Sequence, residues 1–191
     1  MNPKLDSSNV KNAATPGENM LNPHRLNYLL TETQSFQEWK LSHPESYLSH
    51  FFCQINSEIK IGGVEEIGYF NPASQKITVF LALEEQEFKL KDEEEVFKKE
   101  SSEVEKLDLS QAKINFEEAS RICLDRLPKF FPQEERGDGF VVLQTLNRKA
   151  LWNFTFISKK LKFLNLKINA ENGQIESKEC FSVISNDKNN P

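Results

Sequence analysis

The sequence predicts an α+β fold, in which helices pack on one face of an antiparallel β-sheet or of two such sheets. Capping signals precede stretches whose apolar residues recur at helical spacing. Runs of alternating apolar and polar residues, rich in aromatic and β-branched side chains, follow them. The order helix, then hairpin, occurs twice along the 191 residues. A layer of helices over antiparallel strands is the architecture that this order favours.

Two helices are predicted in the first part of the chain. Asn22 followed by Pro23 is typical of a helix start. Ser42 and Glu45 have the spacing of a capping box, as do Ser35 and Glu38 upstream. The residues that recur at helical spacing after this box are Leu48, Phe51, Phe52, Ile55 and Ile59. A helix is therefore predicted from about residue 44 to residue 59, and the glycine pair at 62–63 ends it.

A hairpin follows this helix. Residues 64–70 and 76–83 are β-rich, and the five residues between them include Asn71 and Pro72, which favour a turn. A third strand is predicted at residues 87–90, and a charged helix or linker at residues 93–107. With that third strand, residues 43–91 would be a divergent copy of the C-terminal part of the chain. A tandem of two α-β-β-β units is therefore an open alternative.

The second half predicts one helix and three strands. Asn115 is placed to cap a helix that has Glu118 at its third position, and Pro128 and Pro132 are expected to end it. A loop is expected at residues 137–139 and a strand at residues 140–146. Two further strands alternate apolar and polar residues; their inward-facing members are Trp152, Phe154 and Phe156, then Leu164, Leu166, Ile168 and Ala170.

This second half resembles the PepSY domain over about residues 110–184. The residues that carry the resemblance are the helix start Asn115-Phe116-Glu117-Glu118-Ala119, the aromatic strand at residues 152–156, and the strand and turn Leu164 to Ile175. The family pattern for that turn is Asp-Ala-x-Thr-Gly-x-Val/Ile, and this chain has Asn169 for the aspartate and Asn172 for the threonine. The resemblance implies the same α+β fold and a non-catalytic module.

Four regions follow from these patterns. Residues 1–34 and 185–191 are predicted to be mostly disordered, because they are polar and lack a sustained period. Residues 35–108 form an N-terminal α+β unit with an acidic connector, and residues 109–184 form the PepSY-like unit. The function that the resemblance implies is an interaction or regulatory module that modulates a peptidase or another protein partner in trans. The alternative is a small-ligand-binding protein with an apolar pocket between helix and sheet.

Charge is unevenly distributed along the chain. Residues 84–108 contain eleven acids and five lysines, whereas residues 146–178 contain seven basic residues and two acids. Such runs are typical of solvated faces. As a sharper hypothesis, Lys159, Lys160, Lys162 and Lys167 form a basic patch that meets an acidic partner, and Trp152 lines an exposed groove rather than the core. The acidic balance of the whole chain and the absence of a recognised motif disfavour nucleic acid.

No pattern in the sequence predicts a catalytic, cofactor or metal site. Phosphate-binding loops, zinc-helix motifs and nucleophile elbows are absent from it. His50 and Cys53 would be neighbours on a helix and form the nearest approach to a catalytic dyad, but a cysteine among apolar residues is more typical of a core. No apolar run reaches the length of a signal peptide or membrane span, so a cytoplasmic location is expected. The oligomeric state is left open.

Overall fold

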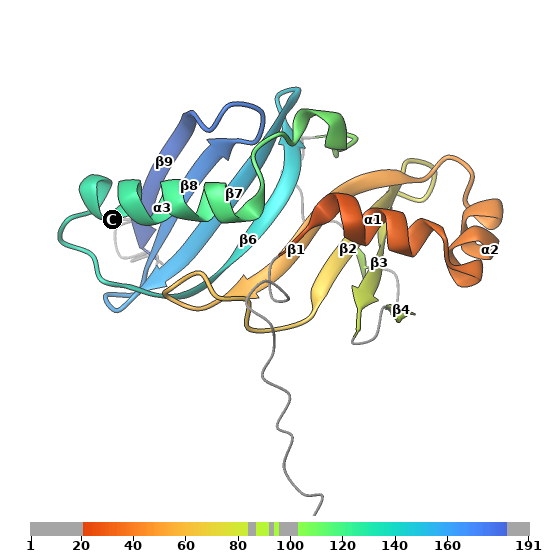
Figure 1. The fold of residues 1–191 in the computed structure, drawn as a ribbon, viewed down its shortest axis with the longest axis horizontal. Helices are drawn as coiled ribbons and strands as arrows, with labels where there is room; N and C mark the ends of the chain where they lie inside the picture. Colours follow the sequence, from red (N-terminus) through yellow and green to blue (C-terminus); the bar gives the residue numbers. More distant parts are fainter. Residues whose placement is uncertain (1–20, 84–86, 92–93, 96–102, 183–191) are drawn as a thin grey trace, which may run out of the picture.

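One antiparallel sheet runs through the described part of the chain (Figure 1). The computed structural model describes residues 21–83, 87–91, 94–95 and 103–182. The strands are β1 (Tyr47–Ile55), β2 (Glu65–Asn71), β3 (Lys76–Ala82), β4 (Phe88–Leu90), β5 (Glu94–Glu95), β6 (Arg136–Leu146), β7 (Lys149–Ser158), β8 (Lys162–Asn169) and β9 (Ile175–Ser182). Their order is β4-β3-β2-β1-β6-β7-β8-β9, and β5 pairs with β3.

Strands β1 and β6 join the two halves of the sheet at its centre. Their antiparallel register places Phe51 opposite Leu143 and Cys53 opposite Val141. From this central pair, successive strands run outward on both sides, each hydrogen-bonded to the one that precedes it in the chain. The sheet is therefore continuous across the 108/109 boundary that the sequence suggested between two units.

Three α-helices lie against parts of this sheet, on the side that faces the viewer in Figure 1. They are α1 (Pro23–Thr31), α2 (Gln34–Ser42) and α3 (Phe116–Phe130), and a short 3₁₀ turn, η2, spans Leu109–Gln111. Helix α1 lies in front of β1 to β3, α2 follows it beside the end of these strands, and α3 lies across β7 to β9. Among the described residues, no helix is long and apolar enough to cross a membrane.

Continuous apolar rows across the sheet form the core beneath the helices. One row consists of residues that face one another from strand to strand, and all of them are buried: Phe80, Ile67, Phe51, Leu143, Trp152 and Ile168. Phe36 of α2 packs on this face, with its ring centroid 5.0 Å from that of Tyr69 and 5.4 Å from that of Phe80. At the other end, the ring of Phe116 lies 5.8 Å from that of Trp152.

The predicted fold class is wrong. The sequence predicted helices packed on one face of one or two antiparallel sheets, with a tandem of two α-β-β-β units as an open alternative, whereas one large sheet dominates the fold. Of the described residues, 43% lie in strands and 24% in helices. The strand total is high because residues 44–59, predicted to be a helix, contain β1 instead. Phe51, Cys53 and Ile55 alternate inward on that strand, and pairing with β6 as well as β2 fixes it in the centre of the sheet.

Several individual elements agree with their predictions. Asn22 caps α1, with its side-chain oxygen accepting a hydrogen bond from the backbone of Arg25, and Asn115 caps α3 in the same way. The β2–β3 hairpin and strand β4 also lie where they were expected. Two details differ: α3 continues through Pro128 to Phe130, and the expected loop at residues 137–139 belongs to β6. Part of the predicted charged segment at 93–107 lies outside the described residues, and β5 is a strand.

Candidate functional site

The main candidate site is a cleft of about 640 Å³ between the two groups of helices. Helix α1 forms one wall, the segment leading into α3 forms the other, and the β2–β3 end of the sheet lies beneath them. Most of the described residues that line it are apolar, including Leu21, Leu26, Leu29, Leu83, Phe88, Ile114, Phe116 and Trp152. Among the described residues, the charged or titratable side chains of the lining are His24, Arg25, Glu65 and Lys113. A volume of this size is within the range of small-molecule sites.

The walls of the cleft are fixed by local hydrogen bonds. The capping residues of α1 and α3, Asn22 and Asn115, both line it, and each uses its side-chain oxygen to accept a backbone N–H of its own helix. The imidazole Nε2 of His24 lies 3.3 Å from the carbonyl oxygen of Ala112 and thereby ties one wall to the other. The backbone N–H of Ile114 donates to Ala170 at 2.7 Å, which anchors the α3 wall to the sheet.

Glu65 is the acidic side chain among the described residues that line this cleft. It is the first residue of β2, and strand alternation places it on the same face as the buried Ile67 and Tyr69. Opposite it on β3 is Ala82, which leaves room above the sheet. Burial raises the pKa of the Glu65 carboxyl above its usual 4.5. No hydrogen bond or ion pair to another described residue compensates the carboxylate for the water that it has lost.

Cys53 lies next to Glu65 but is not a reactive thiol. The pairing of Phe52 with Glu66 continues by one step to bring Cys53 beside Glu65. Burial, and secondarily the charge of Glu65, raise the pKa of Cys53 to about 12, so the thiol stays protonated at neutral pH. The ring of His50 lies on the other face of the sheet, over Gly68. The structure therefore separates the two members of the dyad considered from the sequence.

Trp152 contributes to both the core and the cleft. Its side chain is only 1% exposed, and its indole N–H donates to the carbonyl oxygen of Ile114 at 2.9 Å. The ring also lines the cleft beside Phe116. The structure therefore places this predicted site residue at the bottom of a cleft, where it holds the segment before α3 against the sheet.

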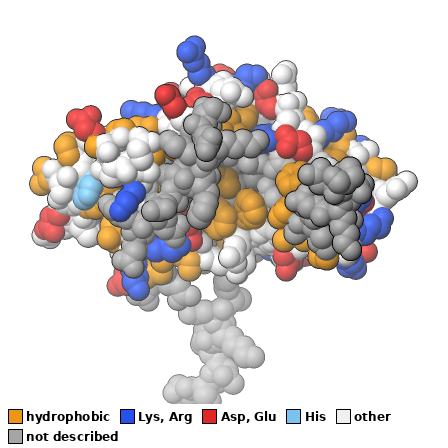
Figure 2. All heavy atoms as spheres, turned by 180° about the vertical axis from the view of Figure 1, so that it is seen from behind, with side chains coloured by type: hydrophobic (Ala, Val, Ile, Leu, Met, Phe, Trp, Pro, Cys, Tyr) orange, Lys and Arg blue, Asp and Glu red, His pale blue; other side chains and the backbone are white. Residues whose placement is uncertain are grey.

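The predicted lysine patch is divided among acidic partners. Lys159 pairs with Glu135 at 2.6 Å, while Lys162 and Lys160 lie 2.7 and 3.9 Å from Glu134. These glutamates belong to the connection between α3 and β6, so their position opposite the β7–β8 turn depends on the fold. Among the described side chains that are visible in Figure 2, which shows the molecule from the side away from the helices, positive and negative ones are intermixed.

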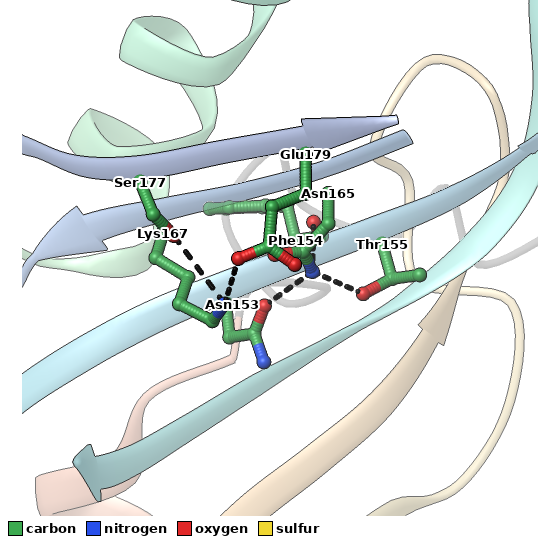
Figure 3. A network of polar contacts seen from close by, with 7 residues as sticks. All are labelled: Asn153, Phe154, Thr155, Asn165, Lys167, Ser177 and Glu179. Carbon is green, nitrogen blue, oxygen red and sulfur yellow. Dashed lines mark hydrogen bonds and ion pairs between the residues drawn. The ribbon is translucent and has the colours of Figure 1, made fainter. Parts of the chain in front are cut away.

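Lys167 belongs to a polar network on the face of the sheet opposite the helices (Figure 3). Its ammonium group lies 3.2 Å from Glu179 and 3.3 Å from the hydroxyl of Ser177 on the neighbouring strand β9. Beside it, the side-chain amide of Asn165 donates to the oxygens of Asn153 at 2.6 Å and Thr155 at 2.8 Å. The four predicted lysines therefore do not form one free basic surface.

Comparisons with known proteins give little further information. No protein-family model matches the chain, and no curated protein sequence matches it. A solved structure described as a "putative lipoprotein" from Clostridium difficile 630 is similar to it, with a TM-score of 0.47 and 12% sequence identity. The alignment covers 76% of this chain and 90% of that one. A similarity at this level carries no argument about the role of any residue.

The sequence analysis did not single out Glu65. It stands in the run Val64-Glu65-Glu66-Ile67, where two adjacent glutamates hide which one faces inward. The alternation of Ile67 and Tyr69 was the available signal, because it places position 65 and not position 66 on the buried face. This alternation identifies Glu65 only when it is already known which face of the sheet the helices contact.

Proposed function

We propose that this protein is a non-catalytic binding module that holds a small, largely apolar ligand in the cleft between α1 and the start of α3. The cleft itself carries the proposal: its volume of about 640 Å³ and the leucines and aromatic rings in its lining suit a small molecule, and the carboxylate of Glu65 at its floor is available for orientation. This function is the alternative that the sequence left open, with an apolar pocket expected between helix and sheet.

The chemistry of the neighbouring groups favours binding over catalysis. Of the two groups considered as a nucleophile and its base, Cys53 is protonated and His50 lies on the far face of the sheet. The histidine at the cleft, His24, is exposed and lies within 3.3 Å of a backbone carbonyl. An acid–base or nucleophilic mechanism needs such groups to converge on one point, and here they are dispersed.

A neutral fluorescent probe tests this function. N-phenyl-1-naphthylamine, which brightens in apolar sites, should bind the wild-type protein saturably. The Leu29→Trp substitution should weaken this binding because the larger side chain narrows the cleft. Leu41→Trp is the matched control, since Leu41 is 83% exposed on α2 and lies outside the cleft lining. Equal binding by both variants, with unchanged circular dichroism, would place the probe elsewhere and refute the proposal.

A trans contact with a protein partner, as the PepSY resemblance implies, is the second candidate function. The observation that favours it is strand β9, which is last in the sheet order and carries mostly exposed side chains, including Phe181 at 50% exposure. An edge strand offers unpaired backbone groups to another chain. A partner captured from native extract by the wild type should be lost with Phe181→Glu and kept with Leu161→Glu, which changes an exposed leucine in the β7–β8 turn. Capture by all three proteins would refute the edge contact.

A further inference from the structure

Glu65 interrupts an otherwise apolar row on the helix-covered face of the sheet. Across β4, β3 and β2 this row contains Phe88, Ala82 and Glu65 in direct register. It continues through Cys53 to Val141, both of which are fully buried. A carboxylate in such a row costs stability unless it gains a partner, because burial removes its hydration. Residues that break a local rule in this way mark sites of function more often than the residues around them.

The cations of the cleft do not neutralise Glu65. His24 and Arg25 on α1 are exposed, as is Lys113 before α3, which lies 2.7 Å from Glu171. None of these three contributes to the shift in the pKa of Glu65, whose cause is burial alone. The basic groups therefore lie at the solvated rim and Glu65 lies at the partly buried floor, beside the protonated thiol of Cys53.

We infer that the ligand of this cleft is an apolar molecule that carries a protonated amine, and that Glu65 is the residue that selects it. This inference rests on the proposed binding function. An ammonium group placed at the floor would donate hydrogen bonds to the carboxylate and neutralise it, while the apolar body of the ligand contacts the leucines above. The amine thereby removes the cost of an unpaired charge, and a neutral ligand of the same size does not.

The difference in burial between Glu65 and the basic side chains of the cleft favours an amine over a carboxylate ligand. Interactions of the rim groups His24, Arg25 and Lys113 are weakened by water and salt, and that of Lys113 is shared with Glu171. A ligand carboxylate would gain little from them and would be repelled by Glu65 if it entered the cleft. The partly buried carboxylate is less screened and has the larger effect on the choice of ligand.

Three ligands of equal chain length separate these effects. The affinities of octylamine, octanol and octanoate would be measured at pH 7.5 by their displacement of the neutral probe. Each measurement would be made on the wild type, on Glu65→Gln and on Glu66→Gln. The matched control, Glu66→Gln, removes the same charge from the adjacent position, which faces the other side of the sheet opposite Phe52. In the wild type, octylamine should bind roughly tenfold tighter than octanol, as expected for a charge-assisted hydrogen bond. Glu65→Gln should abolish this preference and Glu66→Gln should keep it.

The pH dependence gives a second readout. Since the pKa of Glu65 is raised above 4.5, the preference for octylamine should decline as the pH falls towards that raised value, while octanol binding stays constant. The decline should persist in His24→Gln, which removes the imidazole that lines the cleft. Glu65→Leu should fold at least as stably as the wild type because it removes an unpaired carboxylate, and it should lose the amine preference.

The outcomes distinguish this inference from the function on which it rests. If the probe binds in the cleft but octylamine has no advantage, or keeps its advantage in Glu65→Gln, the inference is wrong and the binding function stands. Tighter binding of octanoate than of octylamine would also overturn it and would assign the selection to the rim cations. If the wild type does not bind the probe saturably, both proposals fail.

Discussion

Replacement of Trp152 by phenylalanine tests how the floor of the cleft is held together. The substitution removes the indole N–H that donates to the carbonyl oxygen of Ile114 at 2.9 Å. The loss of one such hydrogen bond costs about 1 kcal/mol. The smaller ring also leaves a void at a position that is 1% exposed, equivalent to about two buried methylene groups or about 1.5 kcal/mol. The free energy of unfolding should therefore fall by about 2.5 kcal/mol by these two estimates.

Urea unfolding followed by far-ultraviolet circular dichroism measures this change without dependence on tryptophan fluorescence. Trp39→Phe is the comparison, because Trp39 is only partly buried and no hydrogen bond to its indole occurs within the described structure. It should cost less than Trp152→Phe. The Trp152 variant should also bind the neutral probe more weakly, since the segment around Ile114 lines the cleft. If the free energy of unfolding falls by less than about 1 kcal/mol in Trp152→Phe, or by the same amount in both variants, the stabilising role assigned to the Trp152 indole is wrong.

Three other predictions concern the rest of the fold. Gly139→Ala should destabilise the protein by about 1–3 kcal/mol in urea unfolding because its Cβ would meet the backbone of β7, whereas Gly62→Ala, with nothing within 4 Å, should be nearly neutral; equal stabilities would contradict the close approach. A thiol reagent should label the exposed Cys180 in the native protein and the two buried cysteines only after denaturation. A hydrogen bond from Lys162 holds the pKa of Glu134 below 4.5, so this pair stabilises the fold above that pH and the contribution is lost as the pH falls through the lowered value. Lys162→Met should therefore be less stable than the wild type at pH 7 and equal to it in acid; a constant difference would contradict the linkage.

Local signals in the sequence predicted the elements that depend on local interactions. Asn22 and Asn115 were recognised as helix caps, and both side chains accept the hydrogen bonds that the pattern requires. The hairpin between β2 and β3 was found because its turn contains Asn71, whose side-chain oxygen accepts a backbone hydrogen bond within the turn. Each of these features involves residues within a few positions of one another.

Strand β1 was mistaken for a helix because its apolar residues satisfy two periods at once. Leu48, Phe51, Phe52 and Ile55 fit helical spacing, whereas Phe51, Cys53 and Ile55 fit the alternation of a strand. The choice between them is made by β6, about 90 residues further on, which pairs with β1 from Ile55↔Gly139 to His50↔Gln144. Long-range pairing of this kind overrides local propensity, and it has no counterpart in a window of neighbouring residues.

The candidate site depends on the same long-range pairing. Glu65 and Glu66 are chemically identical in the sequence, and a shift of β2 by one residue would exchange their faces. The register in which Phe52 faces Glu66 leaves Glu65 on the helix-covered side, where burial raises its pKa. Glu66 points to the other side, within 3.9 Å of Lys91. The property that makes Glu65 a candidate ligand contact therefore arises from strand register and helix placement together, which is why the comparison of Glu65→Gln with Glu66→Gln tests the fold and the proposed site in the same measurement.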